Sequence, residues 1–337
     1  MSRKLILAAL FVAALAAADA AIAQMMRPPA FAGGVPGMAQ FQAIQMQRHQ
    51  ARTLLYREAL EELRRNPAAA DVPDCQVGQG SQDGRCLARA TSASGISIEA
   101  QVRRRFAVLV GNNAYTAPIP ALETPIADVS QIASVLRTRF GFETRIVADA
   151  GKAKIIEALN VIAAEAKPED AVLLMYAGHG YLMEEINMGY WIPVDASVKT
   201  ARGWISNSDI SKLLSAIPAR QLILISDSCY SGSLTKEQKV AQGSEIKAEE
   251  ILKRRSVLVF SSGADEPVSD EGKDGHSIFA WNLIKALQGT GGLTPGAQVW
   301  NSVRTGVSKE YPQQPQYGAV VSAGHVEGGD FLFQAPR

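Results

Sequence analysis

The sequence predicts an α/β protein with a mostly parallel central sheet of about six strands and helices on both faces. Short, continuous apolar runs rich in β-branched residues alternate with longer segments whose apolar residues recur every three or four positions. The short runs are typical of strands buried on both faces, and the longer segments are typical of amphipathic helices. With 337 residues and 47% hydrophobic content, the chain can bury one large core or two smaller ones.

The alternation begins near residue 105. Residues 106–111, FAVLVG, are predicted as the first strand, and residues 125–141 as a helix that ends at Gly141. The same two patterns then continue along the chain. They predict strands at 144–149, 171–180, 221–228 and 256–263, helices at 151–167, 206–217, 277–289 and 297–310, and a last strand at 329–333.

Residues 1–23 are predicted to be a secretory signal peptide. Two basic residues precede an apolar stretch from Leu5 to Ala18, and the small-residue pattern Ala21-Ile22-Ala23 follows. The apolar stretch is rich in alanine and shorter than the roughly 20 residues that span a bilayer, which disfavours a retained anchor. We therefore expect a periplasmic or secreted protein that has no membrane association once the signal is removed.

Residues 24–100 are expected to form a linker, a helix and a loop ahead of the α/β domain at 101–337. The segment after the signal is rich in Pro, Gly and Met, which is typical of a linker. Residues 39–65 are rich in helix formers and stop at Asn66-Pro67, which predicts a helix. The simplest interpretation is that this helix packs one face on the larger domain, and an inhibitory prosegment is the alternative.

The chain has 3 cysteines. Cys75 and Cys86 lie in a Gly-rich polar loop whose length permits a bridge, and disulfides persist in exported proteins, so we predict a disulfide between them. Cys229 would then be unpaired, directly after the predicted strand at 221–228. It is either a small buried hydrophobic residue or a functional thiol.

His179 is the residue best placed to activate that thiol. It follows another predicted strand and stands between Gly178 and Gly180, which let the backbone turn sharply. A cysteine pKa of about 8.5 leaves only a few per cent thiolate at neutral pH, so a nucleophilic Cys229 needs a base. Ligands bind at the carboxyl ends of parallel strands, where both residues are predicted. The residues alone leave open whether the two side chains meet.

The motifs LLMYAGHG and LILISDSCYSG resemble those of the caspase-like cysteine peptidases, specifically the metacaspase and bacterial orthocaspase branch. The similarity runs from residue 105 to 333 and includes VLVGNNAY, PIADVSQIASVL and YPQQPQYG. It implies that residues 101–337 are a catalytic domain with the caspase-like three-layer sandwich. It also implies that Cys229 attacks the scissile carbonyl, that His179 protonates the leaving amine and activates water, and that the N–H groups of Gly180 and Cys229 bind the oxyanion.

Two acidic residues predict cleavage after a basic residue. The resemblance places Asp227 two residues before the nucleophile, where caspases proper have glutamine, and Asp128 where metacaspases have an acid at the start of their first helix. Two carboxylates in one pocket repel each other unless a cation lies between them, so we expect Arg or Lys there, with Arg favoured. A helix-terminal charge for Asp128 and a turn acid for Asp227 are the alternatives. Ala177 replaces a serine that is common in metacaspases, so one pocket hydroxyl is missing.

No cofactor or metal is predicted. The resemblance allows calcium activation, but no acid cluster aligns, and a solvated loop explains the acids at 265–275 equally well. The 34 basic and 33 acidic residues do not indicate a nucleic-acid partner. The basic segment 234–256 is a candidate for self-cleavage after Lys253, Arg254 or Arg255.

We therefore expect an exported, monomeric cysteine endopeptidase that acts on peptides or proteins. The main alternative is a non-catalytic binding module that uses the same cleft. A hydrolase of non-peptide esters or amides is a third class, which the acidic pocket disfavours.

Overall fold

The computed structural model describes residues 38–66, 102–228, 238–239, 248–263 and 272–335. At its centre lies a seven-stranded sheet in the order β2-β1-β3-β7-β9-β13-β8. The strands β2, β1, β3, β7 and β9 are parallel, and β13 and β8 are antiparallel to their neighbours. Their bounds are β1 (Arg105–Gly111), β2 (Glu143–Ala148), β3 (Ala171–Ala177), β7 (Gln221–Asp227), β8 (Gln238–Lys239), β9 (Ser256–Ser261) and β13 (Gln316–Ala319). The predicted α/β class and the largely parallel sheet are confirmed.

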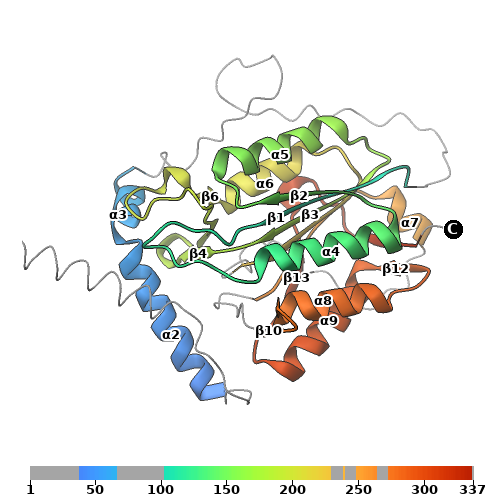
Figure 1. The fold of residues 1–337 in the computed structure, drawn as a ribbon. Helices are drawn as coiled ribbons and strands as arrows, with labels where there is room; N and C mark the ends of the chain where they lie inside the picture. Colours follow the sequence, from blue (N-terminus) through green and yellow to red (C-terminus); the bar gives the residue numbers. More distant parts are fainter. Residues whose placement is uncertain (1–37, 67–101, 229–237, 240–247, 264–271, 336–337) are drawn as a thin grey trace, which may run out of the picture.

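Helices cover both faces of this sheet (Figure 1). One face packs against α4 (Pro125–Phe140), α8 (Ile278–Gly289) and α9 (Gly296–Glu310), and the other against α5 (Lys152–Glu165) and α6 (Asn207–Ala216). Alternate residues of β3 enter the two cores, Leu173 and Met175 on one side and Leu174 and Tyr176 on the other. This alternation explains why the strand is apolar throughout, since neither face is exposed to water.

The helix ends follow local sequence signals. Gly141 ends α4 in the left-handed conformation, at φ 68°, where glycine has no Cβ penalty. Ser206 begins α6 with a capping box, because its side chain accepts from the Asp209 N–H while the Asp209 side chain accepts from the Ser206 N–H. Ser277 caps α8 by accepting from the Ala280 N–H at 2.9 Å.

The helix predicted at 39–65 is two helices, α2 (Met38–Leu55) and α3 (Arg57–Arg65), separated at Tyr56. The Tyr56 ring lies edge-on to Tyr181 and Trp204, at centroid distances of 5.2 and 4.9 Å. Tyr181 belongs to a small sheet of β4 (Gly180–Met183), β5 (Met188–Trp191) and β6 (Ile205–Ser206). The two helices therefore pack on the body of the α/β domain beside the segment that follows His179 (Figure 1).

The end of the chain differs from the sequence prediction. The last strand, β14 (Leu332–Gln334), pairs with β12 (Leu293–Pro295) in a separate two-stranded sheet. The sixth strand of the central sheet is β13, a four-residue strand (QYGA) that lacks the continuous apolar run of β1, β3, β7 and β9. The small sheet β4-β5-β6 was likewise not predicted. The remaining elements are α7 (Ala248–Lys253), the hairpin of β10 (Gly272–Lys273) and β11 (His276–Ser277), and the 3₁₀ turns η2 (Glu184–Ile186), η3 (Ala201–Gly203) and η5 (Val321–Ala323).

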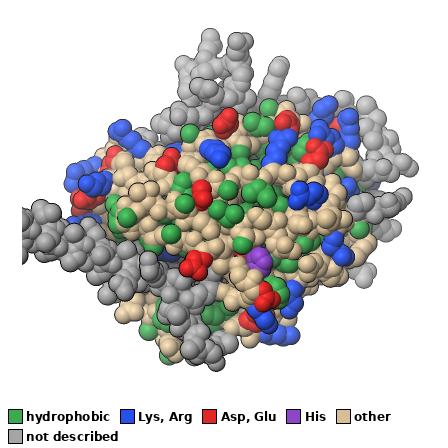
Figure 2. Space-filling model, in the orientation of Figure 1, with side chains coloured by type: hydrophobic (Ala, Val, Ile, Leu, Met, Phe, Trp, Pro, Cys, Tyr) green, Lys and Arg blue, Asp and Glu red, His purple; other side chains and the backbone are tan. Residues whose placement is uncertain are grey.

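The surface is of mixed charge. On the face drawn in Figure 2, Lys and Arg side chains are interspersed with Asp and Glu. Within the described ranges, none of the helices is long and apolar enough to cross a membrane.

Candidate active site

The sheet register aligns the two strand ends that carry the predicted dyad. Strands β3 and β7 are parallel neighbours, and Ala177 pairs with Asp227. The Gly178 N–H donates to the Asp227 carbonyl at 3.2 Å, so the two backbones are still bonded where the strands end. His179 comes two residues after Ala177, and Cys229 comes two residues after Asp227. Cys229 itself lies outside the described residues, as do Cys75 and Cys86.

His179 is held in a defined tautomer. Its side chain is buried, with 4% of the residue exposed, and Nε2 lies 2.8 Å from the Pro120 carbonyl oxygen. Because a carbonyl only accepts, the neutral ring carries its proton on Nε2, and Nδ1 keeps a lone pair. Burial, followed by the positive charge of Arg52, lowers the pKa of His179 to about 3. The resting imidazole is therefore neutral, with Nδ1 able to act as a base.

The positively charged Arg52 of helix α2 lies beside the loop that contains His179. The Arg52 guanidinium, on α2, donates to the Gly180 carbonyl at 3.1 Å and is buried. Gly180 is the residue whose N–H, by the family resemblance, is expected to bind the oxyanion. Helix α2 therefore contacts the loop that bears His179 directly, through a residue that the sequence pattern did not single out.

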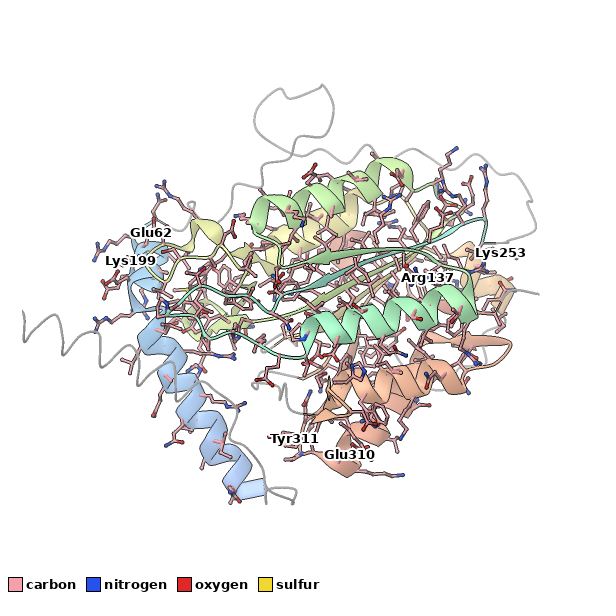
Figure 3. The ribbon with its side chains drawn as sticks, in the orientation of Figure 1. Glu62, Arg137, Lys199, Lys253, Glu310 and Tyr311 are labelled. Atoms are coloured by element: carbon pink, nitrogen blue, oxygen red, sulfur yellow. The ribbon has the colours of Figure 1, made fainter. Side chains whose placement is uncertain are left out.

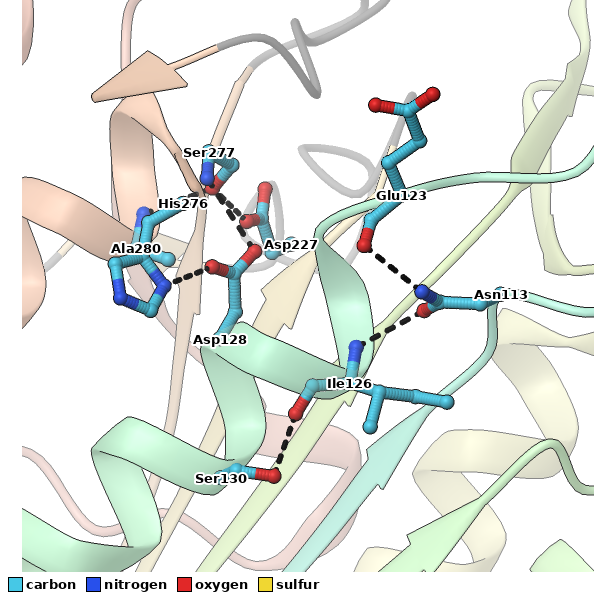
Figure 4. A network of polar contacts seen from close by, with 9 residues as sticks. All are labelled: Asn113, Glu123, Ile126, Asp128, Ser130, Asp227, His276, Ser277 and Ala280. Carbon is cyan, nitrogen blue, oxygen red and sulfur yellow. Dashed lines mark hydrogen bonds and ion pairs between the residues drawn. The ribbon is translucent and has the colours of Figure 1, made fainter. Parts of the chain in front are cut away.

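The two predicted pocket acids, Asp128 and Asp227, meet at one serine (Figure 4). Asp128 is in the first turn of α4 and Asp227 ends β7, and both are buried. The Ser277 hydroxyl donates to Asp227 Oδ2 at 2.6 Å, and the Ser277 N–H approaches Asp128 Oδ2 at 3.4 Å. His276 Nδ1 lies 2.7 Å from Asp128 Oδ1. Elements that are distant in sequence thus place both carboxylates at the start of α8.

Ser277 and His276 were not predicted as site residues. The sequence pattern predicts only that a helix begins at residue 277, and the cap made by Ser277 is the part of its role that a local pattern can reveal. Burial lowers the pKa of His276, while the nearby charge of Asp274 raises it. A neutral His276 facing a carboxylate carries its proton on Nδ1 and donates it to Asp128.

No metal centre was found in the described part of the chain, where no three His, Cys, Asp or Glu side chains are arranged to hold an ion. The acidic segment at 265–275, considered above for calcium, lies mostly outside that part, because residues 264–271 are not described.

The caspase domain family model matches residues 104–322, more than half of the chain, and the chain therefore belongs to this family. It is 25% identical over 285 residues to metacaspase-1B of Aspergillus fumigatus, covering 63% of this chain and 69% of that protein. It is 29% identical over 155 residues to metacaspase-9 of Arabidopsis thaliana, covering 42% of this chain and 47% of the relative. The chain is thus a caspase-like cysteine peptidase of the metacaspase branch.

Solved structures support the same fold. Caspase-1 from Spodoptera frugiperda superposes with a TM-score of 0.51 at 13% identity, covering 74% of this chain and 98% of the insect protein. At this identity, the likeness concerns the fold alone.

Proposed function

We propose that the protein is an endopeptidase that cleaves after Arg or Lys, with Cys229 as nucleophile and His179 as base and acid. The observation that carries the specificity is the meeting of Asp128 and Asp227 at Ser277, beside the strand end that bears His179. Buried carboxylates are stabilised by a cation that bonds to them. A guanidinium, with five N–H donors in a planar fork, can bond to both carboxylates at once.

The reaction follows from the tautomer of His179. Its Nδ1 takes the proton of the Cys229 thiol, and the thiolate forms a bond to the scissile carbonyl carbon. The negative charge moves to the carbonyl oxygen, where the N–H groups of Gly180 and Cys229 stabilise it. When the intermediate collapses, the C–N bond breaks, and the imidazolium returns the proton to the leaving amine.

The acyl-enzyme on Cys229 is then hydrolysed. His179 removes a proton from water, the hydroxide forms a bond to the acyl carbon, and the C–S bond breaks. The thiolate regains its proton from the imidazolium, and the acid product leaves. Every group in both steps belongs to the chain, to the substrate or to water, so the proposal includes no metal or cofactor.

Fluorogenic peptides that end in Arg, Lys or Asp test this proposal. We expect cleavage after Arg and Lys but not after Asp, and no cleavage by Cys229→Ala. Asp227→Asn should lower cleavage after Arg while leaving Cys229 reactive toward iodoacetamide, because the substitution removes pocket charge and not the nucleophile. Cleavage after Asp with none after Arg would refute the pocket assignment. A reactive Cys229 without any cleavage would favour the non-catalytic binding module.

We also propose that the protein is exported and monomeric, with a signal peptide at residues 1–23 and a disulfide between Cys75 and Cys86. The supporting observations are the order of basic, apolar and small residues at the start and the loop length between the two cysteines. Mass spectrometry of the protein from the periplasm and medium, before and after reduction, tests the cleavage and the disulfide. Size-exclusion chromatography tests the oligomeric state.

Self-cleavage in the basic segment is expected after Lys253 rather than after Arg255. The side chain of Lys253 is 61% exposed and lies at the surface in Figure 3. Arg255 is anchored, because its guanidinium donates to the carbonyls of Ala219, Leu214 and Ala323. A bond after Arg255 would reach a protease pocket only if those three contacts broke. Intact-mass measurements on wild type and Cys229→Ala would detect the cut, and identical masses would contradict it.

A further inference from the structure

Two buried tyrosine hydroxyls hold the backbone of His179 on both sides. The His179 N–H donates to the Tyr115 hydroxyl at 2.9 Å. The Tyr176 hydroxyl shares its single proton between the His179 carbonyl at 2.9 Å and the Ile192 carbonyl at 3.0 Å. The two hydroxyl oxygens are 3.5 Å apart. Since Tyr176 gives its proton to a carbonyl, the Tyr115 hydroxyl is the donor of that contact. The bonds run in one direction from the His179 N–H, through both hydroxyls, to the carbonyls of His179 and Ile192.

This arrangement also fixes the proposed oxyanion donor. The His179 carbonyl and the Gly180 N–H belong to one planar peptide and point in opposite directions. That carbonyl accepts from the Tyr176 hydroxyl and from the Ile192 N–H, the latter at 3.0 Å. Rotation of the peptide plane would break the bond from the Ile192 N–H and move the carbonyl away from the Tyr176 hydroxyl, which it shares with the Ile192 carbonyl. The hydrogen bonds to the His179 carbonyl therefore fix the direction of the Gly180 N–H on the opposite side of the same peptide.

The contacts continue to the strand end that leads to the nucleophile. The Tyr176 ring stacks on Trp191, with centroids 4.3 Å apart and planes 9° from parallel. The Trp191 indole N–H donates to the Ser226 hydroxyl at 3.1 Å, and the hydroxyls of Ser226 and Ser228 are 3.0 Å apart. Ser228 directly precedes Cys229 in the chain. One buried layer thus extends from the backbone of His179 to Ser228, the residue before Cys229.

Core packing alone does not account for these hydroxyls. Phenylalanine would fill the same space, and a buried hydroxyl costs free energy unless it is bonded. Burial raises the pKa of Tyr115 to about 12 and that of Tyr176 well above 10, so both remain protonated donors at neutral pH. A Cβ on Gly178 would lie 2.7 Å from the Tyr115 hydroxyl and 2.9 Å from that of Tyr176. Only glycine lets both hydroxyls approach the loop this closely.

We propose that Tyr115 and Tyr176 are positioning residues of the peptidase reaction, which hold the His179 imidazole and the Gly180 N–H in their reactive orientation through backbone hydrogen bonds. The Tyr115 ring supports this from a second direction, since its centroid lies 4.6 Å from that of the imidazole. The inference rests on the proposed function, because the roles of His179 and Gly180 come from it.

The test compares Tyr115→Phe and Tyr176→Phe with Tyr317→Phe. Tyr317, in β13, is a matched control. It is also buried, and its hydroxyl donates to Asp330 at 2.6 Å and not to the backbone of His179. For an Arg peptide we expect kcat to fall roughly 10- to 100-fold in the two site variants, less than the loss of an oxyanion donor itself, with KM within about twofold. Tyr317→Phe should keep kcat within about twofold.

Further measurements separate positioning from folding. Thermal unfolding is recorded for all three variants. If a tyrosine variant does not fold, Trp191→Phe is measured in its place, because it keeps an aromatic ring but loses the N–H donated to Ser226. A kcat in both site variants within twofold of wild type, or an equal fall in Tyr317→Phe, would overturn the inference. If the wild type cleaves after Arg and Cys229→Ala does not, such a result refutes the positioning role alone. If the wild type cleaves no peptide, the proposed function and the inference both fail.

Discussion

Acidification is predicted to destabilise the folded chain through His179. The folded pKa is about 3, because the ring is buried and Arg52 is close, whereas an unfolded histidine titrates near 6.5. Above about pH 6.5, neither state carries the proton, and the stability is fully present. Between about pH 6.5 and 3, the unfolded chain binds a proton that the folded chain does not. The free energy of unfolding therefore decreases as the pH is lowered across this window.

The size of the effect follows from the two pKa values. Each pH unit inside the window costs up to about 1.4 kcal/mol, so the loss between pH 7 and pH 5 is about 2 kcal/mol. This figure is insensitive to the folded value, because any folded pKa below about 4 leaves the site unprotonated at pH 5. For a domain stabilised by roughly 5–15 kcal/mol, such a loss is readily measured.

Urea unfolding at pH 7 and pH 5 measures it. The two proteins compared are Cys229→Ala, which cannot cleave itself by the proposed mechanism, and the double variant that adds His179→Gln. Glutamine does not titrate, while His276, His325 and all carboxylates are common to both proteins and cancel in the comparison. We expect the stability drop to be about 2 kcal/mol smaller in the double variant. Equal drops would refute the assignment of His179 as a buried neutral base.

Three further predictions concern the cap, the loop and the core. Ser206→Ala should lower the free energy of unfolding by about 1 kcal/mol in urea, because it removes a helix cap. Ser277→Ala should lower it further, because it also removes the hydroxyl that donates to buried Asp227. Only Ser277→Ala should also raise KM for Arg peptides, and equal KM values in the two variants would contradict its contact with the pocket. Gly178→Ala should lower kcat at least roughly tenfold, because its Cβ would meet a tyrosine hydroxyl at 2.7 Å. Gly289→Ala is the control and should leave kcat unchanged, because a Cβ there meets nothing within 4 Å. Equal rates in the two variants would contradict the close packing at Gly178. Leu224→Ala in β7 should cost about 2–5 kcal/mol of unfolding free energy, and an unchanged urea midpoint would contradict its burial.

Most elements of the fold were predictable because their signals are local. The apolar runs of β1, β3, β7 and β9 reflect burial on both faces, and Gly141 and Ser206 mark helix ends by backbone and cap chemistry. Strand β13 was missed because it is only four residues long and Gln316 and Gly318 alternate with its apolar residues. The break at Tyr56 was missed because the helical pattern continues through it. What marks Tyr56 is its packing on Trp204, a contact with a distant part of the chain.

The sequence by itself determined most of the strands and helices and the two strand ends that carry His179 and the motif of Cys229. Only the tertiary structure decided which side chains meet there. Asp128 bonds to Ser277 across 149 residues, and Arg52 bonds to Gly180 across 128. Periodicity and caps report on neighbours within one element, whereas these partners are chosen by how separate elements pack. For the same reason, the tyrosine hydroxyls that hold the backbone of His179 became visible only once the sheet and its loops were assembled.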